Sequence, residues 1–184
     1  MAWLANPFAY IAIYTFIPML PGLAARFQLT PMMVGFVCSL WTFVRLGTFF
    51  TLWFWSGWHY RFRWLVSSFA TLIIVFVAIL TAPNLAVLVA AQIFFGAAIG
   101  LIYYSSLFYS MDVGETKGEH GGIHEAALGA GNCVGPAVGA VSLQFFPTIP
   151  HSGVLAVGGL LSLGFLTLLG IQLYSRSRRW MLLP

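Results

Sequence analysis

The sequence predicts an all-α integral membrane protein with six transmembrane helices. Of its 184 residues, 60% are hydrophobic and only 7% are charged, and the mean hydropathy is +0.93. A soluble domain carries about 25% charged residues, so this composition is typical of a membrane protein. The apolar runs approach the roughly 20 residues that a spanning helix needs, whereas a barrel would show alternating segments of about ten.

Net charge and cysteine positions argue against nucleic-acid binding and against a disulfide. The net charge of +4 does not indicate a nucleic-acid partner, because the basic residues are spread over short loops and a tail. Cys38 and Cys133 both lie inside apolar segments, so we interpret them as small apolar side chains and not as a disulfide.

The first two predicted spans each carry a polar or aromatic face. In residues 3–23, Asn6, Tyr10 and Tyr14 share one side of a helix, and Pro18 and Pro21 should bend its far end. This span begins almost at Met1, so we expect either a piece of a longer protein or a half-size protein that must pair. Residues 31–55 form the second span, with Arg45 close to its middle and Trp41 on the same side.

The next two spans differ in polarity. After Ser67, Ser68 and Thr71, the third span (residues 65–80) is purely aliphatic and aromatic. The fourth (residues 85–109) places Gln92, Gly96 and Tyr103 on one face, and Gly96 with Gly100 forms a G-x-x-x-G pattern that favours close helix contact.

A polar loop, residues 111–122, separates the fourth and fifth spans and holds three of the four acidic residues. The fifth span (residues 123–146) has two faces. One carries Glu125, Gly129, Asn132, Pro136 and Gly139, and the other is a glycine stripe of Gly131, Gly135 and Gly139. Small residues at this spacing allow two helices to approach backbone to backbone. The sixth span, residues 154–173, has little polarity.

The distribution of lysine and arginine predicts the orientation. If the N-terminus is cytoplasmic, the inner loops and tail hold six basic residues and the outer loops hold only Arg26; the six are Arg61, Arg63, Lys117, Arg176, Arg178 and Arg179. The positive-inside rule therefore predicts that both termini are cytoplasmic, in the cell (inner) membrane. Spans one, two, four and five carry polar stripes, so we expect them to line a polar cavity, with spans three and six packed outside.

Two motifs resemble those of the major facilitator superfamily. Gly57-Trp-His-Tyr-Arg-Phe-Arg63 is similar to the family's G-x-x-x-D-R-x-G-R-R loop: Gly57, Arg61 and Arg63 match, but Tyr60 stands where the aspartate would be. The run 131–139 is similar to its G-x-x-x-G-P-x-x-G pattern, with Pro136 in place.

The resemblance covers essentially the whole chain and implies the C-terminal six-helix half of a twelve-helix transporter. In that family, helices one, two, four and five of each half surround the cavity. Two halves normally enclose the site near the membrane midplane. We therefore expect a second six-helix half, supplied by a longer chain or by homodimerisation.

The sharpest candidate for a substrate contact is Arg45, because a charge at mid-membrane must face a cavity or a counter-charge. It could instead be a structural arginine bonded to backbone carbonyls. Glu125 could bind a coupling proton or cation, or could simply be a favourable first-turn residue. The two differ in height by about 12 Å, so a direct pair is not expected. The full predicted pathway set is Arg45, Glu125, Asn132, Trp41, Gln92, Tyr10, Tyr14 and Tyr103.

His120 and His124 could bind a metal if they shared a helix, but Gly121-Gly122 argues against a helix there, and a hinge or gate fits better. We predict neither metal nor cofactor.

The leading function is a secondary transporter that moves a small polar or anionic solute by alternating access. The alternative is a non-transporting scaffold or assembly factor. An intramembrane enzyme is not expected, since Ser105 and Ser106 lack a nucleophile motif and the histidines fall at membrane edges.

Overall fold

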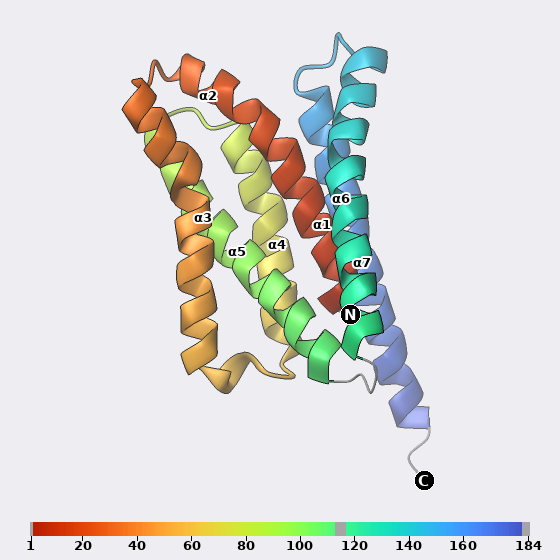
Figure 1. The fold of residues 1–184 in the computed structure, drawn as a ribbon. Coiled ribbons are helices and arrows are strands. Elements are labelled where there is room, and N and C mark those ends of the chain that lie inside the picture. Colours follow the sequence, from red (N-terminus) through yellow and green to blue (C-terminus); the bar gives the residue numbers. More distant parts are fainter. Residues whose placement is uncertain (1, 113–116, 182–184) are drawn as a thin grey trace.

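The chain is all-helical, as predicted. The computed structural model describes residues 2–112 and 117–181, with side chains for all of these except residues 117–120, 176 and 178–181. Within this part of the chain there is no strand, and six helical segments are long and apolar enough to cross a membrane (Figure 1). The fold is therefore that of an integral membrane protein.

The first span is interrupted where its prolines predict a bend. Helix α1 (Ala2–Phe16) passes into the short 3₁₀ helix η1 (Ile17–Met19), which contains Pro18, and then into α2 (Leu20–Arg26), which contains Pro21 near its start. A proline has no backbone N–H to donate and its ring crowds the preceding turn, so the helix changes direction there.

The second and third spans are separated by a structured turn. Helix α3 (Pro31–Phe54) begins at an N-cap, Thr30, whose hydroxyl accepts a hydrogen bond from the Met33 N–H at 3.4 Å. Pro31 occupies the first turn, where its missing N–H costs nothing. After η2 (Ser56–Trp58), α4 (Phe62–Leu80) forms the third span.

The last three helices are longer than the sequence predicts. They are α5 (Leu85–Asp112), α6 (Lys117–Phe145) and α7 (Ser152–Met181). The prediction of a loop over residues 111–122 is wrong for Lys117–Gly122, which are helical, and Gly121-Gly122 does not interrupt α6. Each glycine costs a helix only about 1 kcal/mol relative to alanine, which a helix of this length can absorb. The predicted tail from Ser175 is also helical as far as Met181.

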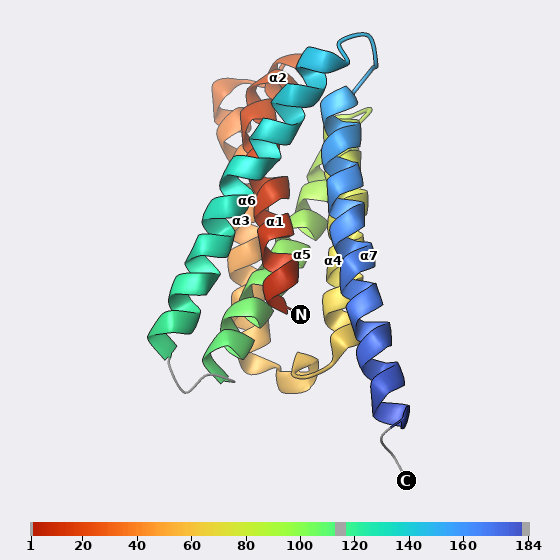
Figure 2. The ribbon, with the colours of Figure 1, turned by 90° about the vertical axis from the view of Figure 1, so that its right-hand side faces the viewer.

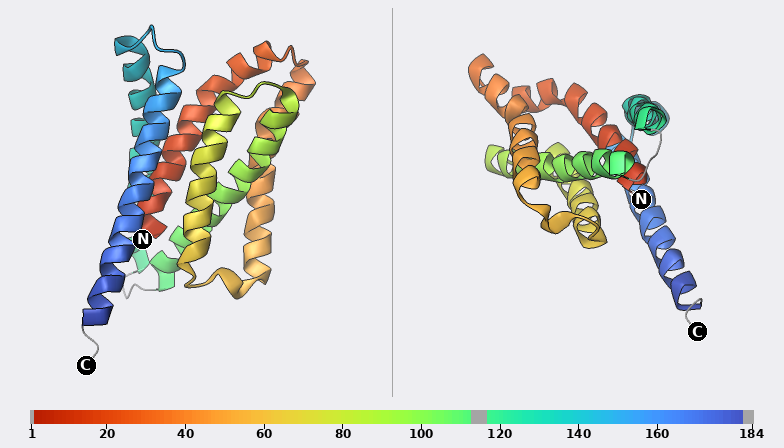
Figure 3. Two further views of the ribbon diagram at one scale, coloured as in Figure 1. Left: turned by 180° about the vertical axis from the view of Figure 1, so that it is seen from behind. Right: turned by 60° about the horizontal axis from the view of Figure 1, so that its bottom comes forward.

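Helix α5 lies at the centre of the bundle. It contacts α3 and α4 along much of its length, and also α1 and α6. Helix α1 packs most extensively on α6, beside which it runs in Figure 2, and α7 covers α1, α4 and α6. Seen from behind and from below, α3 and α6 stand at opposite edges of the bundle (Figure 3). The start of α1, the turn between α3 and α4, and the end of α7 all lie at one end.

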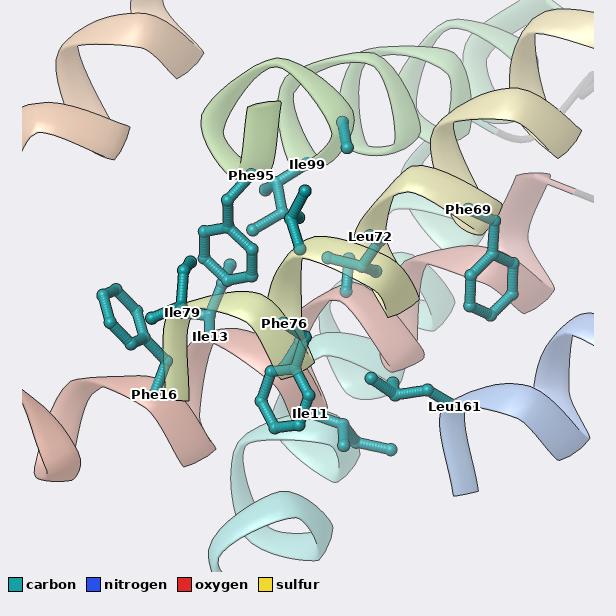
Figure 4. Packing of buried hydrophobic residues seen from close by; sticks show 14 of the residues in the cluster. Ile11, Ile13, Phe16, Phe69, Leu72, Phe76, Ile79, Phe95, Ile99 and Leu161 are labelled. Carbon is teal, nitrogen blue, oxygen red and sulfur yellow. The ribbon is translucent and has the colours of Figure 1, made fainter. Parts of the chain in front are cut away.

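The third span does not stand outside the bundle as its uniform composition predicts. Helix α4 buries a stripe that includes Phe69, Leu72 and Phe76 against its neighbours α5, α7 and α1 (Figure 4). The most exposed helix is instead α3, which buries only Trp41 and Leu52 and packs chiefly on α5. An apolar helix can therefore be a core helix, because composition alone does not distinguish lipid from protein neighbours.

Glycines set the closest helix contacts. A Cβ added at Gly131 would lie 2.5 Å from the Pro7 carbonyl oxygen, and one at Gly135 would lie 2.5 Å from that of Ile11, so α6 rests directly on the backbone of α1. In the same way, Gly96 of α5 meets the Trp41 carbonyl of α3. At Gly139 the nearest atoms are 4.0 Å away, so the predicted stripe is tight only over its first two members.

Candidate functional site

Arg45 lies in the middle of α3 and is surrounded by aromatic rings from three helices. Its guanidinium carbon is 4.7 Å from the ring centre of Tyr103 on α5, 5.4 Å from that of Phe49 on α3, and 5.9 Å from that of Tyr10 on α1. One terminal nitrogen, Nη2, donates a hydrogen bond to the Tyr10 hydroxyl at 3.2 Å. Three of the predicted pathway residues are thus brought together.

The charge of Arg45 is not matched by a carboxylate. Among the residues whose side chains are described, it forms no ion pair, and its Nε is enclosed without a hydrogen-bond partner. Each cation–ring contact contributes roughly 0.5–2 kcal/mol, depending on how dry it is. The arginine is therefore held in place by weak contacts that leave donors available.

Tyr103 connects this cluster to α6. Its ring meets the His124 ring edge-on, with centroids 5.5 Å apart, and lies 6.3 Å from the Tyr10 ring. Tyr14 stacks in turn on Tyr10 at 6.3 Å and is 38% exposed. A continuous series of rings therefore runs from Tyr14 through Tyr10 and Tyr103 to His124.

His124 is buried in a small polar site that the sequence analysis did not identify. Its Nδ1 lies 3.2 Å from the Ser106 hydroxyl on α5, while its Nε2 is enclosed without a partner. The Asn6 side chain on α1 is 1% exposed, and neither of its amide atoms has a hydrogen-bond partner. All three residues line one small enclosed cavity.

A sequence signal for this site existed. Ser106 falls on the predicted polar face of its span and Asn6 on that of the first span, but periodicity alone does not show that these faces meet. The described residues contain no group of three His, Cys, Asp or Glu side chains that could hold a metal. His120 and His124, weighed above as a possible metal-binding pair, both lie on α6, and the side chain of His120 falls outside the described part.

Glu125 and Asn132 lie on α6, and neither forms a hydrogen bond with Arg45 among the described side chains. Glu125 is exposed, and among the described side chains it forms no ion pair with Arg45, although it is within electrostatic reach of Tyr103. Asn132 is half-buried, and its carbonyl oxygen is enclosed without a partner.

Trp41 and Gln92, predicted to line the pathway, lie instead within the core. Trp41 packs edge-on against Phe16 and Phe95, with ring centres 6.4 Å and 5.9 Å away. Gln92 is fully buried, and both polar atoms of its amide lack a hydrogen-bond partner. Both positions are therefore closed to a solute in this structure.

The turn between α3 and α4 is hydrogen-bonded to the end of α5. Tyr60 has a left-handed backbone (φ 53°); its N–H donates to the Tyr109 hydroxyl at 2.6 Å and its own hydroxyl donates to the Asp112 carboxylate. Trp58 is buried and its Nε1 donates to the Leu52 carbonyl at 3.1 Å. Arg61 and Arg63 are exposed, and at Gly57 a side chain would collide with the Trp55 ring.

Through Tyr60, the turn is thus linked to a carboxylate at the end of α5, that of Asp112. The site therefore comprises an aromatic-framed arginine, a buried polar cavity beside it, and a fastened basic turn. No protein-family profile, curated protein or solved structure matches the chain.

Proposed function

We propose that this chain is a secondary transporter, or the C-terminal half of a twelve-helix transporter of the major facilitator type. It would move a small polar or anionic solute by alternating access. The observation that carries the proposal is Arg45, a guanidinium deep in an apolar helix, surrounded by rings and without a carboxylate partner among the described side chains. Such a charge is expensive to keep in a membrane, so an arginine found there is a candidate functional residue.

An anion suits this site for a specific reason. Ring contacts and one neutral hydroxyl bind a guanidinium more weakly than a carboxylate or phosphate would, because charge-assisted bidentate bonds are about twice as strong as neutral ones. A solute anion can therefore displace Tyr10 and be released again. Tyr10 and Tyr103 would flank the solute, Glu125 and Asn132 would line its path, and Glu125 would accept a coupling proton or cation.

The transporter would need a second six-helix half. Arg45 is only half-buried, so its charge would otherwise border lipid. Helix α3 also carries large apolar side chains that are between 51% and 83% exposed and can be covered by lipid or by a partner, namely Phe36, Phe43, Phe50, Trp53 and Phe54. The partner half is supplied by a longer chain or by a second copy, and the positive-inside rule favours cytoplasmic termini in the cell membrane.

The same exposed stripe on α3 favours the second candidate, a non-transporting scaffold. Its closely spaced aromatic side chains offer van der Waals contacts to a helix of another membrane protein, and such packing drives helix association in lipid. In that case Arg45 would serve a neighbouring subunit and not a solute.

Transport by Arg45 variants tests the proposal. The native polypeptide, whose mass is first read with an antibody against its C-terminal tail, is reconstituted in proteoliposomes and assayed with a panel of radiolabelled carboxylates, phosphate and neutral sugars. We expect uptake of an anionic member, and at least a tenfold loss of that uptake in Arg45→Ala.

Arg26→Ala is the matched control, because Arg26 also lies over an aromatic ring, that of Phe27 at 5.4 Å, but outside the site. Undiminished uptake in Arg45→Ala would refute the site assignment. Absence of uptake for every solute, together with stable co-purification with a larger complex, would favour the scaffold.

A further inference from the structure

A groove on the outer side of the bundle carries an inference that does not depend on the proposed function. It lies between α3, α4 and α5 and has a volume of about 340 Å³, and Arg45 is not among its lining residues. Its walls include Thr48 and Thr51 of α3, Ser67 and Thr71 of α4, and Ala97 and Leu101 of α5.

Three of the five hydroxyl groups in the groove walls are already hydrogen-bonded within their own helices. Thr48 donates to the Val44 carbonyl at 2.9 Å, Thr51 to that of Gly47 at 3.0 Å, and Ser67 to that of Trp64 at 3.0 Å. With their hydrogen bonds satisfied within their own helices, these residues present mainly methyl and methylene groups to the groove. The groove is thus suited to hydrocarbon and not to a polar solute.

The end of the groove near the α3–α4 turn has the character of a membrane interface. Trp55 and Trp64 meet there edge-on, with ring centres 5.1 Å apart, as tryptophans commonly do at headgroup level. The guanidinium carbon of Arg63 lies 5.6 Å from the Trp64 ring centre, and its side chain is exposed. Among the described side chains, Arg63 forms no ion pair.

The length of the groove along the helices indicates which kind of molecule fits it. Seven residues separate Trp64 from Thr71, and seven separate Thr48 from Trp55, which corresponds to about 10 Å along a helix. That distance is less than half of a hydrocarbon core about 30 Å thick. A partner helix would need the full thickness, whereas a lipid chain anchored in one leaflet needs only this much.

We propose that this groove binds one acyl chain of an anionic phospholipid, whose phosphate is held by Arg63. The bound lipid braces α3 against α4, two helices that otherwise meet mainly through α5. The occupancy of the groove thereby controls how firmly the helix that carries Arg45 is held.

Lipid titration tests the proposal on the purified full chain. The probes are palmitoyl-oleoyl phosphatidylglycerol and the matching phosphatidylcholine, and the readouts are bound lipids counted by native mass spectrometry and the midpoint of thermal unfolding. We expect phosphatidylglycerol to bind more tightly and to raise the midpoint more. Arg63→Gln should weaken its binding about fivefold, the effect of removing one basic residue near a lipid headgroup.

Two matched controls locate the effect. Arg26→Gln removes an arginine from the same ring-stacked setting at a different helix end and should leave binding unchanged. Ala97→Leu fills the groove and should abolish binding of the stabilising lipid, whereas Ala90→Leu, at an exposed position about two turns away along the same helix and outside the groove wall, should not.

Equal binding of the two lipids, equal loss in the two arginine variants, or unchanged binding in Ala97→Leu would each overturn the proposal. If Ala97→Leu does not fold, phosphatidylglycerol with a photoreactive group in its acyl chain is cross-linked to the unmodified protein. Adducts on the groove-lining peptides of α3, α4 and α5 support the site, and adducts spread over α6 and α7 contradict it.

Discussion

Arg45 shows how one residue can combine a charge with an apolar helix. Placing an arginine at mid-membrane costs about 2.5–3.5 kcal/mol on insertion scales. Three ring contacts and the hydrogen bond to Tyr10 offset part of this cost without neutralising the charge. Lysine could not replace it equivalently, because an ammonium lacks the flat surface that stacks on Tyr103.

Gln92 differs from Arg45 because no contact in the described part of the chain offsets the cost of burying its polar side chain. Its amide is fully buried and makes no hydrogen bond within the described residues. We expect Gln92→Met to raise the free energy of unfolding by about 1 kcal/mol, because it removes two unsatisfied polar atoms while preserving volume. Thermal or chemical unfolding in detergent measures this.

Gln144 offers the comparison, since it is exposed on α6 and Gln144→Met should change stability by less than about 0.5 kcal/mol. Clear destabilisation by Gln92→Met would mean that the amide has a partner in the membrane and belongs to a polar network.

For a single residue, the sequence predicts which side of its helix it occupies, but not which residue of a neighbouring helix it contacts. Helical periodicity places Tyr10 and Tyr103 on the polar sides of their helices, and both contact Arg45. The same periodicity places Gln92 with them, although it is buried elsewhere. The contact of Tyr60 with Asp112 and that of His124 with Ser106 join separate elements, and no periodicity within one helix encodes them.

Among the helices, the contact between α1 and α6 depends on glycine. The α6 backbone lies against α1 at Gly131 and Gly135, where no Cβ would fit. In lipid, where apolar surfaces gain little by meeting each other, such close packing is a main source of helix association.

We therefore expect Gly135→Ala to lower the free energy of unfolding by about 1–3 kcal/mol, because the added methyl would force the two helices apart. Gly129→Ala is the control within the same helix: its Cβ would meet nothing within 4 Å, so the substitution should be neutral or stabilise by up to about 1 kcal/mol. Equal effects of the two variants would contradict the packing argument. Unfolding in detergent distinguishes them.

The sequence predicts the spans well and their ends less well. Length, hydropathy and the prolines at residues 18 and 21 were sufficient to locate all six spans. Gly121-Gly122 was not sufficient to end a helix, since α6 continues through it. Nor did the apolar composition of α4 show that its neighbours are other helices.

For the whole molecule, orientation in the membrane is the first property to establish. The turns containing Ser56 and Thr148 lie at opposite ends of the bundle (Figure 1), and both side chains are exposed. In a background with Cys38 and Cys133 replaced by alanine, we expect a membrane-impermeant maleimide to label Thr148→Cys in intact cells. Ser56→Cys should react only after the membrane is opened. The reverse pattern would place the termini outside.

The pairing of α1 with α6 has a consequence for biogenesis. Helices α3, α4 and α5 follow one another closely and can assemble as they leave the ribosome, but the most extensive partner of α1 is the fifth span to be made. Until then, Asn6 and the flat backbone surface around Pro7 and Ile11 remain uncovered in lipid. Partly synthesised chains that end after α5 are therefore the forms that most need an insertase or chaperone at the translocon, and those that quality-control proteases should recognise first.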